Sequence, residues 1–150
     1  MSIEENKEVV RKVIRAFNER NLALLDTLIA PGYVDHFHNL HGVEEYRQFL
    51  TILLAAFPDW HEDIADIIAE GDKVWCRFEA RATHTGEFRG PLPSTGKKIT
   101  LAPTGKRITP TGVIVCRILN DKIVEAWEVS DLLSLYEQLG VIEYKVFPEG

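Results

Sequence analysis

The N-terminal third of the chain has apolar residues at helical spacing. Ser2 and Glu5 have the three-residue spacing of a capping box, which marks the start of a helix. The residues that follow at the spacing of one buried helix face are Val9, Val10, Val13, Ile14 and Phe17. A second short helix is predicted over residues 22–29, where a Pro-Gly pair ends it, and a third over residues 43–57. The pattern thus predicts three amphipathic helices before any long strand.

The rest of the chain is dominated by alternating apolar and polar residues, which is typical of half-buried strands. The predicted strands cover residues 60–69, 73–85, 112–119 and 121–131. In the second of them, one face carries Val74, Cys76, Phe78, Ala80, Ala82 and His84. A last short helix is predicted over residues 132–139. Helices that precede the strands must cover one face of the sheet, so the sequence predicts an α+β fold with a mostly antiparallel sheet.

The last predicted strand combines bulky apolar residues with acids on one face. Strict alternation gives this face Ile123, Glu125, Trp127, Val129 and Asp131. A two-residue turn at 120–121 fixes the register with the preceding strand, which places Cys116 opposite Glu125. In the same register Ile114 lies opposite Trp127. We therefore predict that this face points inward, where burial raises the pKa of a carboxyl group and makes it a candidate proton shuttle.

Composition and charge limit the class of partner. The chain has 150 residues, of which 45% are hydrophobic and 27% charged, as expected for one domain spanning residues 1–150. Its formal net charge is −6, whereas phosphate binding requires clustered lysines and arginines, which argues against nucleic acid or an anionic membrane as a partner. The sequence begins without a signal peptide and has no apolar run of 18 residues, so we expect a cytoplasmic location.

Three of the five histidines lie in an irregular segment, residues 33–42, which also contains Tyr33. Loops rich in ring side chains often line a binding site, although His38 and His41 fit a plain polar connection equally well. The histidines lack a carboxylate or cysteine partner at metal-ligand spacing, and no CxxC or HExxH motif is present. We therefore expect no metal site. Cys76 and Cys116 each fall inside a predicted strand, which suits small buried side chains better than a disulfide.

Two further features concern the middle of the chain. His84 shares its strand face with small alanines that leave room for a ligand, although a structural buried histidine is the alternative. The segment Thr-Gly-Lys-Lys-Ile-Thr at residues 95–100 returns as Thr-Gly-Lys-Arg-Ile-Thr at residues 104–109. Because two copies do not make a solenoid, we interpret this repeat as a lengthened surface loop or hairpin. Its Gly-Lys pairs lack the spacing of a phosphate-binding loop.

Several short motifs together resemble one family. They are Phe57-Pro58-Asp59, Glu70-Gly71-Asp72-Lys73-Val74, Thr83-His84-Thr85-Gly86-Glu87-Phe88, Thr95-Gly96-Lys97, Lys122-Ile123-Val124-Glu125-Ala126-Trp127 with Asp131, and Gln138-Leu139-Gly140. They resemble the SnoaL-like polyketide cyclases, also called predicted ester cyclases, which have the cone fold of nuclear transport factor and ketosteroid isomerase. The resemblance covers nearly the whole chain and implies a strongly curved sheet, closed by helices around an internal pocket. The duplicated Thr-Gly-Lys segment departs from the family pattern of one copy.

The resemblance also implies a reaction. Cyclases of this family close a ring by an intramolecular aldol reaction, without metal or cofactor, on a hydrophobic carbonyl or polyketide-like substrate. Their acid/base aspartate matches Asp131, and His36 and His84 match positions where the wider family often has histidine. We expect Asp131 to remove a proton and one of these histidines to stabilise the enolate. The residues expected to hold the substrate are Tyr33, Phe57, Trp60, Val74, Phe78, Ile114, Glu125 and Trp127.

The residues leave alternatives for both role and function. Asp131 could merely cap the helix over residues 132–139, and Glu125 could be a buried structural acid or orient a histidine. The same cone fold also includes isomerases and hydrolases, among them epoxide hydrolases, but these need an inward arginine and the register places Arg117 outward. A third possibility is a non-enzymatic module that binds a small apolar molecule. Finally, outward Trp75, with Val124 and Ala126, predicts a homodimer through the sheet.

Overall fold

The computed structural model describes residues 2–93, 95–146 and 149–150. Its helices are α1 (Ile3–Asn18), α2 (Leu22–Leu28), α3 (Gly42–Ala56) and α4 (Leu132–Leu139). Its strands are β1 (Ile29–Asp35), β2 (Leu40–His41), β3 (His61–Glu70), β4 (Lys73–Thr83), β5 (Phe88–Pro91), β6 (Lys98–Leu101), β7 (Arg107–Ile108), β8 (Thr111–Leu119) and β9 (Lys122–Ser130). Within the described part of the chain, no helix has the length and apolar character needed to cross a membrane.

Short-range sequence signals determine where the helices begin and end. The hydroxyl of Ser2 accepts the backbone N–H of Glu5, whose carboxylate accepts the backbone N–H of Ser2, so the predicted capping box is confirmed. The side chains of Asn21 and Asp131 cap α2 and α4 by accepting the backbone N–H groups of Leu24 and Ser134. Gly140 ends α4 in the left-handed conformation, with φ 73°.

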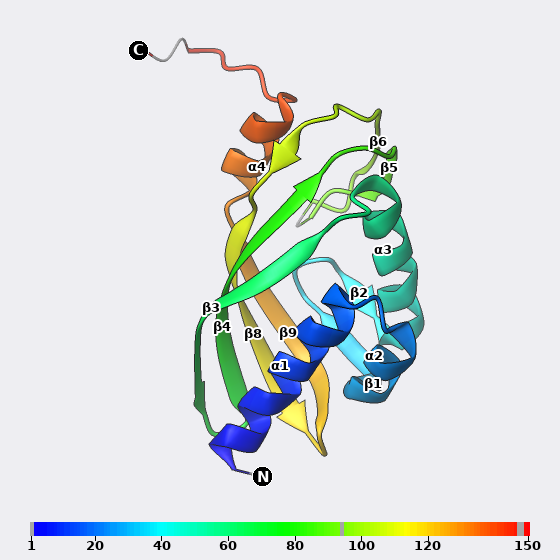
Figure 1. Ribbon diagram of the computed structural model, residues 1–150, viewed down its shortest axis with the longest axis vertical. Coiled ribbons are helices and arrows are strands. Elements are labelled where there is room, and N and C mark those ends of the chain that lie inside the picture. The colour runs from blue at the N-terminus through cyan, green and yellow to red at the C-terminus, as the bar shows by residue number, and fades with distance from the viewer. Residues whose placement is uncertain (1, 94, 147–148) are drawn as a thin grey trace.

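One curled sheet surrounds the interior of the molecule. Its strand order is β2-β1-β9-β8-β4-β3, and β7 pairs with the end of β4. The pairs are antiparallel except that β1 runs parallel to β9. This β1 pairing was not predicted, because the segment that contains Pro31 and Gly32 lacks a strand pattern. The hairpin β5–β6 forms a small sheet of its own beside α3 (Figure 1).

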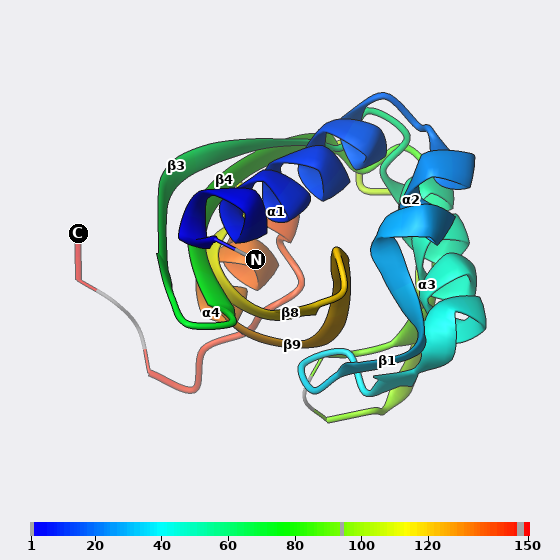
Figure 2. The same cartoon turned by 90° about the horizontal axis from the view of Figure 1, so that it is seen from below.

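The helices close the open side of the curled sheet. Figure 2 shows α1 lying across the hollow of β3, β4, β8 and β9, while α2 and α3 stand on the side of β1. The strand β4 alternates as predicted, with Val74, Cys76, Phe78, Ala80 and Ala82 buried. Val74 and Cys76 form one core with α1 residues such as Val9, Val10 and Ile14, whereas Ala82 packs in a second cluster with Phe57 and Leu139. The predicted α+β cone, with three N-terminal helices on a strongly curved sheet, is therefore confirmed.

A β-bulge in β9 reverses the predicted faces of this strand. The turn at Asn120 and Asp121 has the positive φ angles of a tight hairpin and pairs Leu119 with Lys122, as predicted. Two pairs later Arg117, and not Cys116, lies opposite Glu125, because one extra residue interrupts the ladder. An inserted residue shifts all later side chains to the other face. From this bulge onward Ala126, Glu128 and Ser130 point inward.

The two copies of the repeated segment adopt the same turn in different places. In each copy the threonine hydroxyl accepts the N–H of the lysine two residues on, at 3.3 Å, and the glycine between them has φ near 70°. The first copy, residues 95–100, leads into β6 of the separate β5–β6 hairpin. The second copy, residues 104–109, leads into β7 on the main sheet. The repeat therefore produces one hairpin and one anchored strand.

Candidate functional site

The interior holds two adjoining chambers. The outer chamber has a volume of about 160 Å³ and lies between α3, α4 and the β5–β6 hairpin, whereas the inner chamber, of about 110 Å³, lies between α1 and the sheet. Five residues line both chambers, and we call them the junction: His38, Phe49, Leu53, Glu62 and Glu128. Three of these five side chains are ionisable, so the polar groups of the cavity are concentrated between its two apolar parts.

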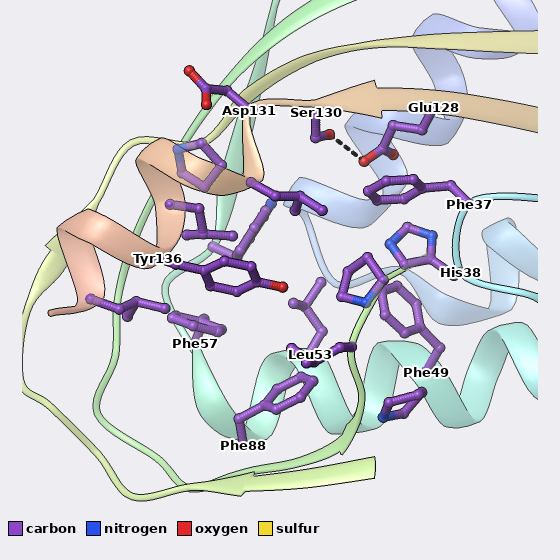
Figure 3. Close-up of a pocket in the computed structure, with 18 of the residues that line it drawn as sticks. Phe37, His38, Phe49, Leu53, Phe57, Phe88, Glu128, Ser130, Asp131 and Tyr136 are labelled. Atoms are coloured by element: carbon purple, nitrogen blue, oxygen red, sulfur yellow. Dashed lines mark hydrogen bonds between the residues drawn. The ribbon is translucent and has the colours of Figure 1, made fainter. Parts of the chain in front are cut away.

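Ring and aliphatic side chains form most of the outer chamber. Figure 3 shows Phe37, Phe49, Phe57 and Phe88 around a common space, with the Tyr136 hydroxyl pointing into it. The hairpin β5–β6 adds Pro91, Leu92, Ile99 and Leu101 to the wall, and α4 adds Leu132, Leu135 and Leu139. A cavity with few polar groups among many apolar ones is typical of a site for a small hydrophobic molecule.

Glu128 enters the junction from β9. The hydroxyl of Ser130, two residues further on the same face, donates a hydrogen bond to its carboxylate (Figure 3). Room for this pair comes from Gly112 on the facing strand, since a Cβ there would lie 2.6 Å from Ser130 Oγ and 2.9 Å from a ring carbon of Phe78. Burial raises the pKa of Glu128, although the nearby His38 opposes this increase.

Glu62 reaches the junction from β3. Its carboxylate accepts a hydrogen bond of 3.0 Å from the indole Nε1 of Trp60. Burial raises its pKa from 4.5 to about 7, and the charge of Glu128 adds to this effect, while the Trp60 hydrogen bond and His38 oppose it. A carboxyl group with such a pKa carries a proton in a large share of molecules at neutral pH. The junction therefore combines two acids whose pKa values burial raises, and the pKa of Glu62 reaches about 7.

His38 is held at the junction by a buried aspartate. Its Nδ1 lies 2.9 Å from Oδ2 of Asp35, at the end of β1, and its ring packs between Phe37 and Phe49 with ring centres 4.8 and 4.3 Å away. Burial lowers the pKa of His38, but the hydrogen bond and the charge of Asp35 outweigh it, so the net pKa is raised. Burial would raise the pKa of Asp35, but its hydrogen bonds with His38 and Tyr33 lower it overall. Both shifts favour an imidazolium paired with a carboxylate.

Chemically, this arrangement supports proton transfer in an apolar space. A carboxylate can remove a proton, a protonated carboxyl group can return one, and an imidazolium can stabilise a developing oxyanion. Within the residues that the structure describes, no group of three or more His, Cys, Asp or Glu side chains is arranged to hold a metal ion.

The comparisons with known proteins fit this fold and cavity. The profile of the SnoaL family, described as SnoaL-like polyketide cyclase, matches residues 7–139. This chain belongs to the SnoaL-like polyketide cyclase family. The resemblance noted in the sequence motifs is thereby confirmed over most of the chain.

Similar individual proteins include cyclases of the family. The aklanonic acid methyl ester cyclase DauD of Streptomyces sp. (strain C5) is 27% identical, over 95% of this chain and 85% of that protein. The crystal structure of IdmH from Streptomyces antibioticus, to which a polyketide cyclase activity has been attributed, is 31% identical with a TM-score of 0.72, over 91% of this chain and 99% of that one. A hydroxylase activity has been attributed to AclR from Streptomyces galilaeus. Its crystal structure is 28% identical in sequence, with a TM-score of 0.77, over 95% of this chain and 89% of that one.

Several of the residues predicted to hold a substrate lie at the chambers of this SnoaL-like fold. Phe57, Trp60 and Phe78 line the outer chamber, and Tyr33 and Ile114 line the inner one. Val74 is fully buried in the core between α1 and the sheet and borders neither chamber. These placements follow from the strand alternation and helix faces that the sequence displays.

The bulge moves another group of predicted site residues to the outer face of the sheet. The carboxylate of Glu125 accepts a hydrogen bond of 3.0 Å from Nε of Arg117. Its other oxygen lies 2.7 Å from Nε2 of the exposed His36. The His36 ring stacks on Trp127 with ring centres 5.1 Å apart, and Lys73 Nζ lies 5.6 Å from the centre of the indole. The prediction that the side chains of Glu125 and Trp127 point inward is therefore wrong, although Trp127 also borders the inner chamber. The outward position of Arg117 is confirmed.

His84 is fully buried, but it lines neither chamber. Its ring stacks on Phe57, and Nδ1 lies 3.0 Å from the hydroxyl and 3.2 Å from the backbone N–H of Thr104. The N–H of Gly105 also donates to the His84 carbonyl. Burial lowers the pKa of His84. The position of His84 thus matches that of a structural buried histidine, which anchors the second copy of the repeat.

Asp131 borders the outer chamber, but its carboxylate does not point into it. The side chain is exposed and accepts the backbone N–H of Ser134 at 3.0 Å, which caps α4. Figure 3 shows the carboxylate directed away from the rings of the chamber. The capping alternative therefore matches the geometry, and an acid/base role for Asp131 stays a prediction.

The residue pattern alone selects neither Glu62 nor Glu128, and it leaves the role of His38 open. Glu62 shares a strand face with the apolar Ile64, which is a usable signal of an inward acid. For Glu128 no comparable signal exists, because its face depends on a bulge that alternation alone does not reveal. For His38 the missing information was its aspartate partner, three residues earlier in the same segment.

Proposed function

We propose that this protein is a cyclase that closes a ring in a hydrophobic carbonyl compound by an intramolecular aldol reaction. The observation that carries this proposal is the junction: two carboxyl groups, Glu62 and Glu128, whose pKa values burial raises, and the ring of His38 held by Asp35 meet between two apolar chambers. Membership of the SnoaL-like polyketide cyclase family supports the reaction class. A polyketide-like substrate would place its carbonyl groups at the junction and its apolar parts in the chambers.

In the proposed reaction Glu128 is the base. It takes a proton from the carbon beside one carbonyl group, and the resulting enolate carbon forms a bond to a second carbonyl carbon of the same molecule. His38 donates a hydrogen bond to the enolate oxygen while the charge is present. The oxygen of the second carbonyl then takes the proton that Glu62 holds. The product is an isomer of the substrate, and one proton exchanged between the two carboxyl groups through solvent restores the starting state.

The first experiment uses a substrate suggested by the relatives. Because DauD is named for aklanonic acid methyl ester, this ester is the compound to supply first. Chromatography with mass detection should show a new species of unchanged mass that depends on the protein. The matched variants are Glu128→Gln, which should lose this activity, and Asp131→Asn, which should keep it because asparagine caps a helix as well as aspartate does.

The assay also separates this proposal from its rivals. Loss of activity in Asp131→Asn with full activity in Glu128→Gln would return the acid/base role to Asp131. Saturable binding of the ester, followed by no new species in a range of such carbonyl compounds, would instead support a non-enzymatic binding module. An epoxide hydrolase receives no support from the geometry, since Arg117 lies outside the cavity with Glu125.

We also propose that two copies of the chain associate through the outer face of the sheet. A hollow of about 520 Å³ on this face is lined by Lys73, Trp75, Val113, Val115, Trp127, Glu128 and Val129. The side chains of Trp75 and Val129 are 48% and 78% exposed, which is unusual for large apolar groups that gather in one place. Charges of both signs, Arg117 and Glu125 among them, border this apolar face. A two-fold axis through the hollow would bury it against its own copy.

A further inference from the structure

Asp35 is a buried carboxylate with all its bonds directed to one short segment. It ends β1 and is 7% exposed. Its Oδ1 accepts the backbone N–H groups of Phe37 and His38, each at 2.9 Å. Its Oδ2 accepts the hydroxyl of Tyr33 at 3.2 Å and lies 2.9 Å from Nδ1 of His38. One carboxylate therefore holds both the backbone and the ring of His38.

These contacts determine which nitrogen of His38 is available. An ionised carboxylate can only accept, so Nδ1 must carry the proton in the Asp35 contact. In the described part of the chain Nε2 has no hydrogen-bond partner, while the ring lines both chambers. Packing against Phe37 and Phe49 limits rotation of the ring. Nε2 is thus left for a ligand at the junction.

We propose that Asp35 is a positioning residue for the reaction, which holds the His38 ring with Nε2–H presented at the junction, and that Tyr33 supports Asp35. This inference rests on the proposed aldol reaction. Asp35 would act only through His38, because its two oxygens are occupied by the four contacts described above. A positioned imidazolium needs no reorganisation when negative charge develops on the enolate, which is the main advantage of a prearranged donor.

The charges around His38 support this role. The groups that act on it are Asp35 from β1, Glu62 from β3 and Glu128 from β9, and all three favour its protonated form. Two tyrosines lie next to this group. Tyr33 donates a hydrogen bond to Asp35, and the ring of Tyr46 of α3 lies edge-on to that of Tyr33, with ring centres 5.5 Å apart. Both tyrosines stay neutral because burial raises their pKa values. Of the three acids, only Asp35 makes a direct hydrogen bond with the ring. Removing its charge should therefore change both the orientation and the pKa of His38.

The test is Asp35→Asn, with the histidine rings followed by NMR during a pH titration. We expect the pKa of His38 to fall and its proton to redistribute between Nδ1 and Nε2, because an amide can present either an acceptor or a donor to the ring. The matched control is Glu125→Gln on the outer face, which should affect His36 and leave His38 unchanged. In turnover, we expect kcat to fall by about 10- to 100-fold, the range typical of lost outer-shell partners, with little change in KM.

Tyr33→Phe provides a second variant that keeps the charge of Asp35 and removes one of its four contacts. It should shift the His38 titration by a smaller amount and in the opposite direction, because a carboxylate with one donor fewer stabilises the imidazolium more strongly. It serves as the test if Asp35→Asn does not fold. An unchanged His38 titration in a folded Asp35→Asn protein would overturn the inference. So would a shifted titration with unchanged kcat. The NMR result does not require turnover, so a failed aldol assay with a shifted His38 would count against the proposed function and not against the Asp35–His38 contact.

Discussion

The strand β9 presents two glutamates, three residues apart, to two different environments. Glu128 lies at the junction of the chambers, where burial raises its pKa. Glu125 lies on the outer face, where hydrogen bonds from His36 and Arg117 lower its pKa. Each glutamate has a histidine nearby, His38 inside and His36 outside. The same two residue types thus occur twice across one sheet, once in an apolar cavity and once beside water.

The comparison shows that position relative to the bulge decides which pair can take part in chemistry. Without the extra residue in β9, Glu125 would face the core and Glu128 would face solvent. Water stabilises the ionised form of an exposed acid and leaves it a weak base. Desolvation raises the pKa of the inner one, which makes its ionised form a stronger base.

The largest difference is expected between Glu128→Gln and Glu125→Gln. Loss of a general base typically costs about 10²- to 10⁴-fold in rate, so the Glu128 variant should lose kcat in this range. The Glu125 variant should retain the wild-type rate within error, because its carboxylate borders neither chamber. Steady-state kinetics with aklanonic acid methyl ester, or another carbonyl compound that the protein converts, provides the measurement. Equal losses in both variants would remove the distinction.

A smaller difference is expected between the two histidines. His38→Ala removes the proposed oxyanion donor and should reduce kcat by about 100- to 1000-fold, the order found when one such donor is lost. His36→Ala removes a ring that stacks on Trp127 outside the cavity and should leave kcat unchanged. The same kinetic assay compares them. If kcat fell as much in His36→Ala as in His38→Ala, the outer face of the sheet would have to contribute to the site.

The neighbouring acids Glu62 and Asp63 of β3 should have opposite effects on stability. Glu62 has a pKa of about 7 in the folded protein, so the wild type loses stability as pH rises from about 4.5 to about 7, by at most roughly 3 kcal/mol. Glu62→Gln lacks this loss and should gain stability relative to wild type over that range. The pKa of Asp63 is lowered by its hydrogen bonds with His61 and Arg81, so Asp63→Asn should be relatively less stable at neutral pH, with a difference that shrinks in acid.

Urea unfolding at several pH values measures both of these differences. A substitution also alters packing, and this effect is the same at all pH values. The ionisation of Glu62 or Asp63 is therefore reported only by how the difference in unfolding free energy between variant and wild type changes with pH. A Glu62→Gln difference that stays constant between pH 4.5 and pH 7 would mean that Glu62 ionises normally in the folded protein.

The smallest effect on activity is expected from the outer hollow. Val129→Lys places a charge on a side chain that is 78% exposed in one copy, and it should convert the proposed dimer to a monomer. The junction is on the other face of β9, so kcat per chain should stay close to wild type. Sedimentation at assay concentration gives the mass. A wild-type protein that is already monomeric there would contradict the proposed association.

Helix ends and the β4 faces were predictable because each depends on signals local in sequence, whereas the curved cone was expected from the resemblance of several motifs to a known family. The capping box at Ser2 and the strict alternation around Val74 are examples. The parallel strand β1 was not, because its pairing with β9 joins segments about ninety residues apart and its pattern contains Pro31. Part of the cavity wall, such as Phe57 and Trp60, was predictable for the same local reasons.

The polar centre of the site was harder to predict than its apolar wall. A single extra residue in β9 changes the face of every later side chain, and alternation alone cannot reveal such an insertion. As a result the pattern selected Glu125 where the fold presents Glu128. Asp131 carries the residue type that suits both an acid/base group and a helix cap, and only the direction of its carboxylate distinguishes the two.

Proton abstraction itself can be measured most directly by hydrogen exchange in the substrate. In D₂O the wild-type protein should introduce deuterium at the carbon beside the reacting carbonyl, as seen by mass spectrometry of recovered substrate and product. Glu125→Gln and Asp131→Asn should introduce it at the same rate, and Glu128→Gln should not do so above the uncatalysed rate. Deuterium entry that continues at the wild-type rate in Glu128→Gln would contradict the assignment of the inner glutamate as the base.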